Sequence, residues 1–231
     1  MTEHAVIVAM DFSSKEEVYG FLGKLGGERP YLKIGMELFY KEGPDMVRKL
    51  KGDGYKIFLD LKLHDIPNTV YKAMKNLAGL GVDIANVHAA GGIKMMEWAR
   101  KGLNEGGGER TQLIAITQLT STDEKTLHEE LLIPESLPYT VKKYAMNAKA
   151  AGLDGVVCSA HEAPIISELG LISVTPGIRL SGDDVNDQKR VATPSLAREL
   201  GSTHIVVGRS ITAAGDPLAA YLRTVKEFIG Q

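Results

Sequence analysis

Cysteine, long hydrophobic runs and an excess of charge of one sign are all nearly absent from this sequence. The one cysteine, Cys158, excludes a disulfide within the chain, and such cysteine usage is typical of a reducing compartment. Basic and acidic side chains number 27 and 29, which gives a formal net charge of −2. This balance offers no electrostatic reason to bind nucleic acid or an acidic membrane surface.

Signals for membrane insertion and export are also lacking. No apolar stretch approaches the roughly 20 residues that a membrane-spanning helix requires. Residues 1–11 contain a short apolar run that ends in an acid, without the basic flank or the cleavage site of a signal peptide. Cys158 stands in the apolar run 155–160, where we expect a buried thiol and no nucleophile. Together these absences predict a cytoplasmic protein with no membrane partner.

What the sequence does have is a regular alternation of short apolar runs and amphipathic stretches. The apolar runs predict strands at 5–11, 31–36, 56–63, 84–88, 112–119, 155–159, 172–175 and 204–208. The stretches between them predict helices at 15–25, 44–51, 68–80, 94–103, 139–151, 163–169, 195–200 and 217–229. Eight β–α units without a compositional break predict an α/β protein, a (β/α)8 TIM barrel in a single domain over 1–231.

The run from Ile57 to Asp65 has the most unusual pattern in the chain. Its apolar residues predict a strand buried on both faces, yet it carries Asp60 and Lys62 two residues apart. Alternate residues of a strand point to one side, and buried charges are costly unless they are paired. The two residues could form a structural ion pair at a strand end, or belong to a charge row that tunes a catalytic lysine.

A second lysine favours the catalytic interpretation. Lys33 lies in the apolar run 31–36, and two such lysines on successive strands, with Asp60 between them, predict one shared pocket. Active sites of barrels lie at the carboxyl ends of the strands. There the sequence places Asp11, Lys62, Asp65, His88, Thr120, Arg179 and Arg209. The opposite ends of the strands offer no comparable cluster of polar residues. For His88 we favour a hydrogen-bonded structural role over catalysis.

The last third of the chain predicts a phosphate site and a lid. Strand 204–208 leads into Gly208 and Arg209, and the loops after the last two strands of such barrels commonly bind phosphate. The connection 180–193, which carries Gln188, is longer than the usual loop of about 2–6 residues, and such loops are often lids. The segment Thr175-Pro-Gly before it predicts a hinge.

The chain closely resembles the orotidine 5′-phosphate decarboxylase family. The matching segments, in family order, are Ala9-Met-Asp11, Lys33-Ile-Gly35, Asp60-Leu-Lys62-Leu-His-Asp65-Ile-Pro-Asn-Thr69, Thr175-Pro-Gly-Ile-Arg179, Gln188 and Val207-Gly-Arg209. The resemblance covers nearly the whole chain. It implies removal of carbon dioxide from orotidine 5′-monophosphate to give UMP, the last step of de novo UMP biosynthesis. It also implies a homodimer with shared active sites, without a cofactor or a metal.

The resemblance further implies a role for each matching residue. Lys62 would protonate C6 of the pyrimidine, with Asp60 beside the substrate carboxylate. Asp65 and Thr69 would enter the site of the neighbouring subunit, and Lys33 would belong to the charged network. The binding residues would be Asp11 and Lys33 at the ribose hydroxyls, Thr120 at the pyrimidine edge, Gln188, Gly208 and Arg209 at the phosphate, and Arg179 at the base of the lid.

Two alternatives compete with this interpretation. A metal-dependent sugar-phosphate decarboxylase or aldolase of the same barrel group shares the Asp-x-Lys-x-x-Asp pattern. Such relatives resemble one another in carrying a glutamate, a magnesium ligand, where this chain has Lys33, and a cation there opposes binding of a second cation. A non-catalytic nucleotide-phosphate binding protein would have no need of a buried lysine–aspartate row. We therefore favour both alternatives less.

Overall fold

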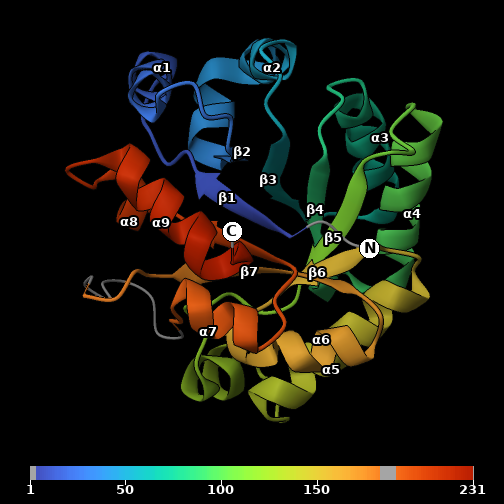
Figure 1. The fold of residues 1–231 in the computed structure, drawn as a ribbon. Coiled ribbons are helices and arrows are strands. Elements are labelled where there is room, and N and C mark those ends of the chain that lie inside the picture. Colours follow the sequence, from blue (N-terminus) through green and yellow to red (C-terminus); the bar gives the residue numbers. More distant parts are fainter. Residues whose placement is uncertain (1–3, 183–190, 231) are drawn as a thin grey trace.

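A computed structural model describes residues 4–182 and 191–230 of the chain. Within these residues, eight parallel strands form a closed barrel in which strands adjacent in sequence pair and the first strand pairs with the last. Figure 1 shows the strands as an inner ring with the helices packed around it. The predicted (β/α)8 TIM barrel is confirmed.

All of the predicted strands are present, several of them ending slightly earlier than the sequence suggested. The strands are β1 (Ala5–Ala9), β2 (Tyr31–Gly35), β3 (Ile57–Leu63), β4 (Ile84–His88), β5 (Gln112–Ile116), β6 (Gly155–Val157), β7 (Ile172–Ile178) and β8 (His204–Val207). Strand β7 is the exception, because it continues beyond the predicted end at 175. The Thr175-Pro-Gly segment therefore lies inside a strand and not at the base of the loop. Its expected role as a hinge stays a prediction. Gly177 has a φ of 80°, and the register against β8 shifts between Thr175 and Ile178.

Helices follow the strands in the expected order. They are α1 (Lys15–Leu22), α2 (Met36–Gly52), α3 (Pro67–Ala78), α4 (Gly92–Glu105), α5 (Leu137–Ala150), α6 (Ala163–Glu168), α7 (Pro194–Glu199), α8 (Arg209–Thr212) and α9 (Pro217–Ile229). Short turns of other helix types are η1 (Gly23–Leu25), η2 (Ala89–Gly91), η3 (Thr126–Glu130) and η4 (Ala160–Glu162).

Two helices differ from the sequence-based expectation. Helix α2 begins at Met36, well before the predicted start at 44, and contains a kink at Gly43, whose φ is 72°. The prediction began at Pro44 because proline is typical of a first helical turn, and here it marks the restart after the kink. Helix α8 was not predicted, since a single turn is too short to show a hydrophobic period.

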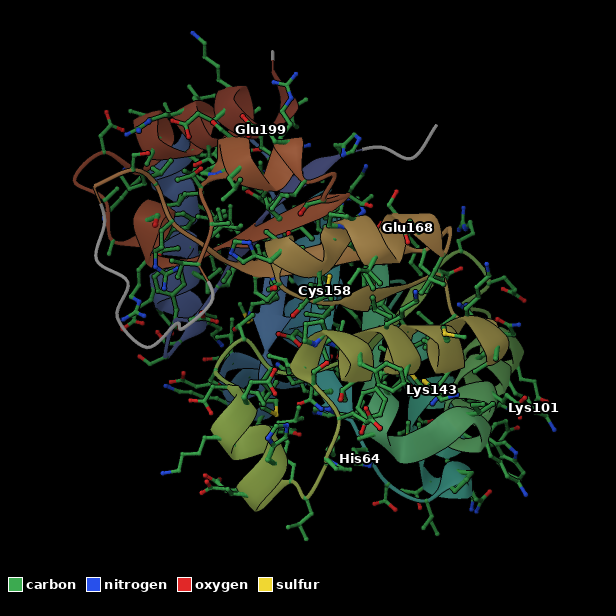
Figure 2. The ribbon with its side chains drawn as sticks, turned by 90° about the horizontal axis from the view of Figure 1, so that it is seen from below. His64, Lys101, Lys143, Cys158, Glu168 and Glu199 are labelled. Carbon is green, nitrogen blue, oxygen red and sulfur yellow. The ribbon has the colours of Figure 1, made fainter. Side chains whose placement is uncertain are left out.

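The barrel has two apolar layers. Inside the ring, alternate strand residues such as Ile7, Phe58 and Ile114 pack together, and a larger cluster fills the space between the strands and the helices. Cys158 is fully buried in this outer cluster, as expected, and Figure 2 shows it within the body of the molecule while Lys101 lies at the periphery. Among the described residues, none of the helices is long and apolar enough to cross a membrane.

Candidate active site

A cavity of about 430 Å³ lies at the carboxyl ends of the barrel strands. Its volume is in the range of sites that bind small organic ligands. Its apolar floor is formed by strand residues, which are Ala9, Phe58, Ile116, Val157, Val174 and Val206. Its polar walls contain most of the residues selected from the sequence, namely Asp11, Lys33, Asp60, Lys62, Thr120, Arg179, Gly208 and Arg209. The barrel therefore brings together residues from distant parts of the chain.

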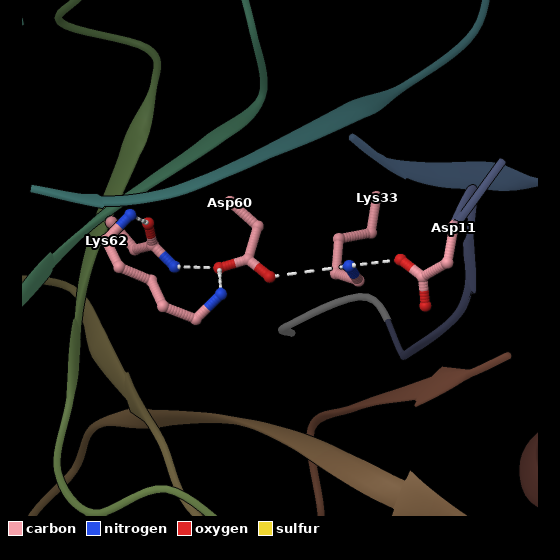
Figure 3. A network of polar contacts seen from close by, with 5 residues as sticks. Asp11, Lys33, Asp60 and Lys62 are labelled. Atoms are coloured by element: carbon pink, nitrogen blue, oxygen red, sulfur yellow. Dashed lines mark hydrogen bonds and ion pairs between the residues drawn. The ribbon is translucent and has the colours of Figure 1, made fainter. Parts of the chain in front are cut away.

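Four of these side chains form a row of alternating charge along one wall (Figure 3). Lys33 Nζ lies 3.1 Å from Asp11 Oδ1 and 3.5 Å from Asp60 Oδ2. Lys62 Nζ lies 2.8 Å from Asp60 Oδ1. The order Asp11, Lys33, Asp60, Lys62 follows neighbouring strands, since β1 pairs with β2 and β2 pairs with β3. Each charge in the row thus has an opposite charge as its neighbour.

Asp60 is the centre of this row and its most buried member. Burial by itself would raise the pKa of Asp60, but the charges of Lys33 and Lys62 and the hydrogen bonds from Lys62 and Asn86 outweigh it and lower that pKa. Asp60 is therefore held as a carboxylate inside the protein. An ionised group with this burial requires partners on both oxygens, and the two lysines meet that requirement.

Lys62 reaches the cavity from an irregular part of β3. Its φ is 52°, in the left-handed region that residues other than glycine rarely adopt. The register between β3 and β4 shifts between Leu59 and Leu63, around this residue. Strained backbone of this kind is concentrated at functional sites, where the surrounding structure enforces it. The sequence pattern did not show this irregularity, because alternation predicts a regular strand.

Another part of the cavity wall is formed by the ends of β7 and β8. Gly208 and Arg209 follow β8, and Arg179 follows β7. The two ends of the long connection after β7 are held together, because the Arg179 N–H group donates to the carbonyl of Ala192 at 3.0 Å. The Ala192 N–H group in turn donates to the carbonyl of Gly177 at 3.2 Å. Gln188, the residue selected within this connection, lies outside the described residues.

Two selected residues do not reach the cavity of their own barrel. Asp65 and Thr69 are exposed, and neither is among the residues that line it. Asp65 accepts a hydrogen bond from the N–H group of Ile66 at 2.6 Å, next to a side chain of Ile66 that is itself exposed. These residues are therefore at the surface of the described chain, outside the lining of the cavity that Lys62 reaches.

His88 also does not line the cavity that contains the row of charges. Its ring packs against the ring of His64, with centroids 5.5 Å apart, and both line a neighbouring cavity. Burial, together with the nearby His64 and Lys62, lowers the pKa of His88 below its usual value. A neutral imidazole is therefore expected there at neutral pH, which makes His88 a poor proton donor.

Two buried polar residues at the site were not predicted from the sequence. Gln118 lines the cavity directly, and Asn86 donates a hydrogen bond to Asp60 Oδ1 at 2.6 Å. Both were placed within apolar strand runs, so the signal that could have found them was a polar side chain inside a strand. Among the described residues, no group of three or more His, Cys, Asp or Glu side chains could hold a metal ion.

The chain is similar to known proteins over nearly its whole length. The family profile described as "Orotidine 5'-phosphate decarboxylase / HUMPS family" matches residues 4–224. A curated relative from Geobacillus thermodenitrificans, named orotidine 5′-phosphate decarboxylase, is 56% identical over 230 residues, which cover 97% of this chain and 96% of that protein. A relative of the same name from Bacillus cereus is 58% identical over 229 residues, which cover 96% of each.

Solved structures agree with the sequence matches. An orotidine 5′-phosphate decarboxylase from Lactobacillus acidophilus is 44% identical, with a TM-score of 0.87 over 97% of this chain and 98% of that one. A structure described as an uncharacterized conserved protein from Geobacillus kaustophilus is 52% identical, with a TM-score of 0.85 over 96% of this chain and 99% of that one.

Proposed function

This chain belongs to the orotidine 5′-phosphate decarboxylase / HUMPS family, and we propose that Lys62 is its proton donor in the conversion of orotidine 5′-monophosphate to UMP and carbon dioxide. The enzyme is a carboxy-lyase of UMP biosynthesis, an assignment that rests on relatives 56% and 58% identical that are named orotidine 5′-phosphate decarboxylase. The family description alone covers more than one activity, so the names of these relatives carry the choice between them.

The reaction breaks the bond between C6 of the pyrimidine and the carboxylate carbon. The electron pair of that bond stays on C6, carbon dioxide leaves, and a proton must then reach C6 to complete UMP. The difficult species is the carbanion at C6, so catalysis requires a site that binds negative charge at C6 more strongly in the transition state than in the ground state. An ammonium group aimed at C6 would supply both the positive charge and the proton.

The observation that carries the proposal is the row of alternating charge on the cavity wall. Lys62 Nζ lies 2.8 Å from Asp60 Oδ1 at the end of that row, which places its ammonium group at the cavity wall. Asp60 stays ionised because Lys33 and Lys62 oppose the effect of burial and lower its pKa. In the proposed complex the substrate carboxylate lies beside Asp60, and their repulsion is relieved when carbon dioxide leaves.

The remaining cavity residues would bind the rest of the nucleotide. Asp11 and Lys33 would bind the ribose hydroxyls, and Thr120 would contact the pyrimidine edge. Gly208 and Arg209 would bind the phosphate, because Gly208 permits close approach to the backbone and an arginine presents a fork of donors to phosphate oxygens. All five residues line the described cavity.

The proposal includes closure of the connection 180–193 on the substrate phosphate. Arg179 would mark its base, and Gln188, outside the described residues, would contact the phosphate. Binding energy from the phosphate, which is remote from C6, would then be used to assemble and dry the site. The backbone pairing of Arg179 with Ala192, which joins the two ends of this connection, supports an ordered base for such a movement.

The proposal also includes a homodimer with shared active sites that works in the cytoplasm. The outward position of Asp65 and Thr69, together with the exposed apolar side chain of Ile66 beside them, supports their entry into the site of a second copy. A single buried cysteine suits the reducing cytoplasm.

A metal-dependent sugar-phosphate decarboxylase or aldolase is the alternative that the barrel alone would allow. The position of Lys33 Nζ, 3.1 Å from Asp11 and 3.5 Å from Asp60, argues against it, because an ammonium group already lies between the two carboxylates that could face a cation. We expect exhaustive chelator treatment to leave the rate of decarboxylation unchanged. A loss of activity that magnesium restores would favour the metal-dependent alternative.

A spectrophotometric assay with orotidine 5′-monophosphate tests the function itself. The purified chain should convert the substrate to UMP, which is followed by the change in absorbance of the pyrimidine and by release of carbon dioxide. Tight binding of UMP without turnover would instead favour a non-catalytic nucleotide-phosphate binding protein.

A further inference from the structure

Asn86 lies opposite the irregular part of β3. Pairing between β3 and β4 joins Leu59 to Ala85 and then Leu63 to Val87. Residues 60–62 of β3 therefore face a single residue of β4, which is Asn86. An insertion of this kind disrupts the hydrogen bonds between strands and redirects the side chains of the bulged strand. Asn86 thus faces the segment that carries both Asp60 and Lys62.

The side-chain amide of Asn86 contacts both of those residues. Its Oδ1 atom accepts a hydrogen bond from the Lys62 N–H group at 2.7 Å, and its Nδ2 atom donates one to Asp60 Oδ1 at 2.6 Å. The reverse orientation of the amide would place two donors together and an oxygen against a carboxylate. The two hydrogen bonds therefore fix the amide in one orientation and depend on each other.

These contacts determine how the Asp60 carboxylate is shared. Oδ1 of Asp60 accepts from both Asn86 Nδ2 and Lys62 Nζ, whereas Oδ2 faces Lys33 at 3.5 Å. Rotation of the carboxylate would break the contact with Asn86. The same amide holds the backbone of Lys62, whose φ of 52° is in the left-handed region. One buried side chain, 1% exposed, thus constrains both members of the Asp60–Lys62 pair.

We propose that Asn86 is a positioning residue of the reaction, which sets the place of the Lys62 ammonium by holding the Lys62 backbone and the Asp60 carboxylate together. Asn86 does not line the described cavity, so it would act through Lys62 and Asp60 without contacting the substrate. This inference rests on the proposed function. Displacement of a reacting group by about 1 Å can reduce turnover about 10²-fold.

A purely structural role is the competing explanation. The Lys62 N–H group has left the regular pairing of β3 with β4, and a buried N–H group without an acceptor destabilises the fold. If Asn86 did no more than satisfy this group, its loss would lower stability and leave turnover per folded molecule unchanged. The two explanations therefore differ in kcat, not in stability.

The first test compares Asn86→Leu with a control that loses a similar buried hydrogen bond elsewhere. Thr111, just before β5, is 4% exposed and donates from Oγ1 to the carbonyl of Val82 at 2.7 Å. We expect Thr111→Val to lower the melting temperature without changing kcat. We expect Asn86→Leu to lower kcat about 10²-fold, while KM for orotidine 5′-monophosphate and the affinity for UMP change less than about threefold.

The second test uses pH to restore the interaction. In Asn86→Asp the introduced carboxyl lies against Asp60, and two carboxyl groups at this distance share a proton at a raised pKa. When protonated, the introduced group can donate to Asp60 and accept from the Lys62 N–H group, as the amide does. We therefore expect kcat of Asn86→Asp to rise as pH falls through the pKa of the pair. The unmodified enzyme and Thr111→Val should not show this rise.

The outcomes separate the inference from the function on which it rests. An active unmodified enzyme with kcat of Asn86→Leu within about threefold of it would overturn the positioning role alone. If Asn86→Leu does not fold, the pH profile of Asn86→Asp decides, and a profile parallel to that of the unmodified enzyme would overturn the role. Absence of turnover in the unmodified enzyme would overturn the proposed function first, and the positioning role with it.

Discussion

The two ends of the barrel both place carboxylates beside cations, but they connect them differently. At the amino ends of the strands, Asp83 accepts hydrogen bonds from the N–H group of Ile57 at 2.7 Å and from Lys51 Nζ at 2.6 Å. Asp154 repeats this arrangement just before β6, with one backbone N–H group and one arginine. Each of these carboxylates ties a strand to a helix, and neither shares its cation with another carboxylate in the described contacts.

At the carboxyl ends, a single carboxylate is shared. Asp60 contacts both Lys33 and Lys62, and Lys33 also contacts Asp11. At the amino ends, a backbone N–H group donates a hydrogen bond to a carboxylate. At the carboxyl ends, the backbone N–H group of Lys62 donates instead to the neutral amide of Asn86. The side chain of Asp60 is 9% exposed, whereas that of Asp83 is 33% exposed.

Ion pairing is present at both ends of the barrel, so ion pairing by itself does not distinguish a candidate catalytic site. A carboxylate with one cation and one backbone N–H group has its partners within the fold and stabilises the junction where it lies. A buried carboxylate that serves two lysines holds those lysines at a cavity wall, where a substrate can reach them. If this contrast in connection corresponds to a contrast in function, substitutions at the two ends of the barrel should differ in their effect on turnover.

The largest expected effect comes from removing Lys62 at the carboxyl end, and Lys51 at the amino end provides the matched control. Lys62 and Lys51 are matched, since each side chain is 25% exposed and each ammonium lies within 2.8 Å of a carboxylate oxygen. We expect Lys62→Ala to lower kcat at least about 10³-fold, because general acid catalysis and charge stabilisation are lost together. Lys51→Ala should change kcat less than about twofold. Steady-state kinetics on both variants, with UMP binding as the test of folding, make the measurement.

Comparable losses in the two variants would remove the distinction between the ends of the barrel. If the Lys62→Ala variant binds UMP and still decarboxylates the substrate substantially, Lys62 is excluded as the proton donor.

Much of this contrast was visible in the sequence. The strands were found because parallel strands buried on both faces form short apolar runs, and the charge row was found because Asp60, Lys62 and Lys33 interrupt such runs. Segment β4 was predicted with the bounds it has, 84–88. The number of β–α units was enough to predict closure of the barrel.

Other features were not predicted, each for its own physical reason. The left-handed conformation of Lys62 follows from the bulge opposite Asn86, and a one-dimensional pattern cannot show which residue faces a bulge. The continuation of β7 through Pro176 was missed because proline normally ends a strand prediction. The early start of α2 at Met36 was missed because Gly43 and Pro44 suggested a boundary where the helix has only a kink.

The second prediction distinguishes the residues expected to bind the phosphate from those of the charge row. Arg209 is expected to bind the phosphate, and it has no ion pair with the charge row among the described contacts. We therefore expect Arg209→Ala to lower kcat/KM about 10²-fold on orotidine 5′-monophosphate, because a charge-assisted contact contributes about 1.5–3 kcal/mol, and to have little effect on the nucleoside orotidine. Gln188→Ala should behave in the same way. The control is Arg100→Ala at the amino ends, which should affect both substrates equally and only through stability.

Equal losses on the nucleotide and the nucleoside in Arg209→Ala would contradict the phosphate assignment. They would show that this arginine acts on the pyrimidine or on the stability of the barrel.

The third prediction concerns whether residues of two subunits together form the active site at the carboxyl ends of the strands. If Asp65 acts in the site of a partner, a heterodimer of Lys62→Ala and Asp65→Ala has one intact site and one site with both defects. Random mixing of the two inactive homodimers should restore about a quarter of all sites, by the symmetry of a two-fold interface. Either variant mixed with itself provides the baseline. No recovery, despite exchange of subunits shown by mass labelling, would place Asp65 outside a shared site.

The smallest effect on turnover is expected from removing the carboxylate of Asp83, at the amino ends of the strands. Asp83→Ala removes the acceptor of the Ile57 N–H group and the partner of Lys51, so it should lower the free energy of unfolding by about 1–3 kcal/mol. Its kcat should stay within about twofold of the unmodified enzyme below the unfolding temperature, because in the described part of the chain the hydrogen-bond partners of Asp83 are Lys51, Ile57 and Gln112, which do not line the cavity. Denaturant unfolding and kinetics on the same sample measure both quantities. A stably folded Asp83→Ala with strongly reduced kcat would show that the amino end also positions the reacting groups, and the contrast between the two ends would then fail.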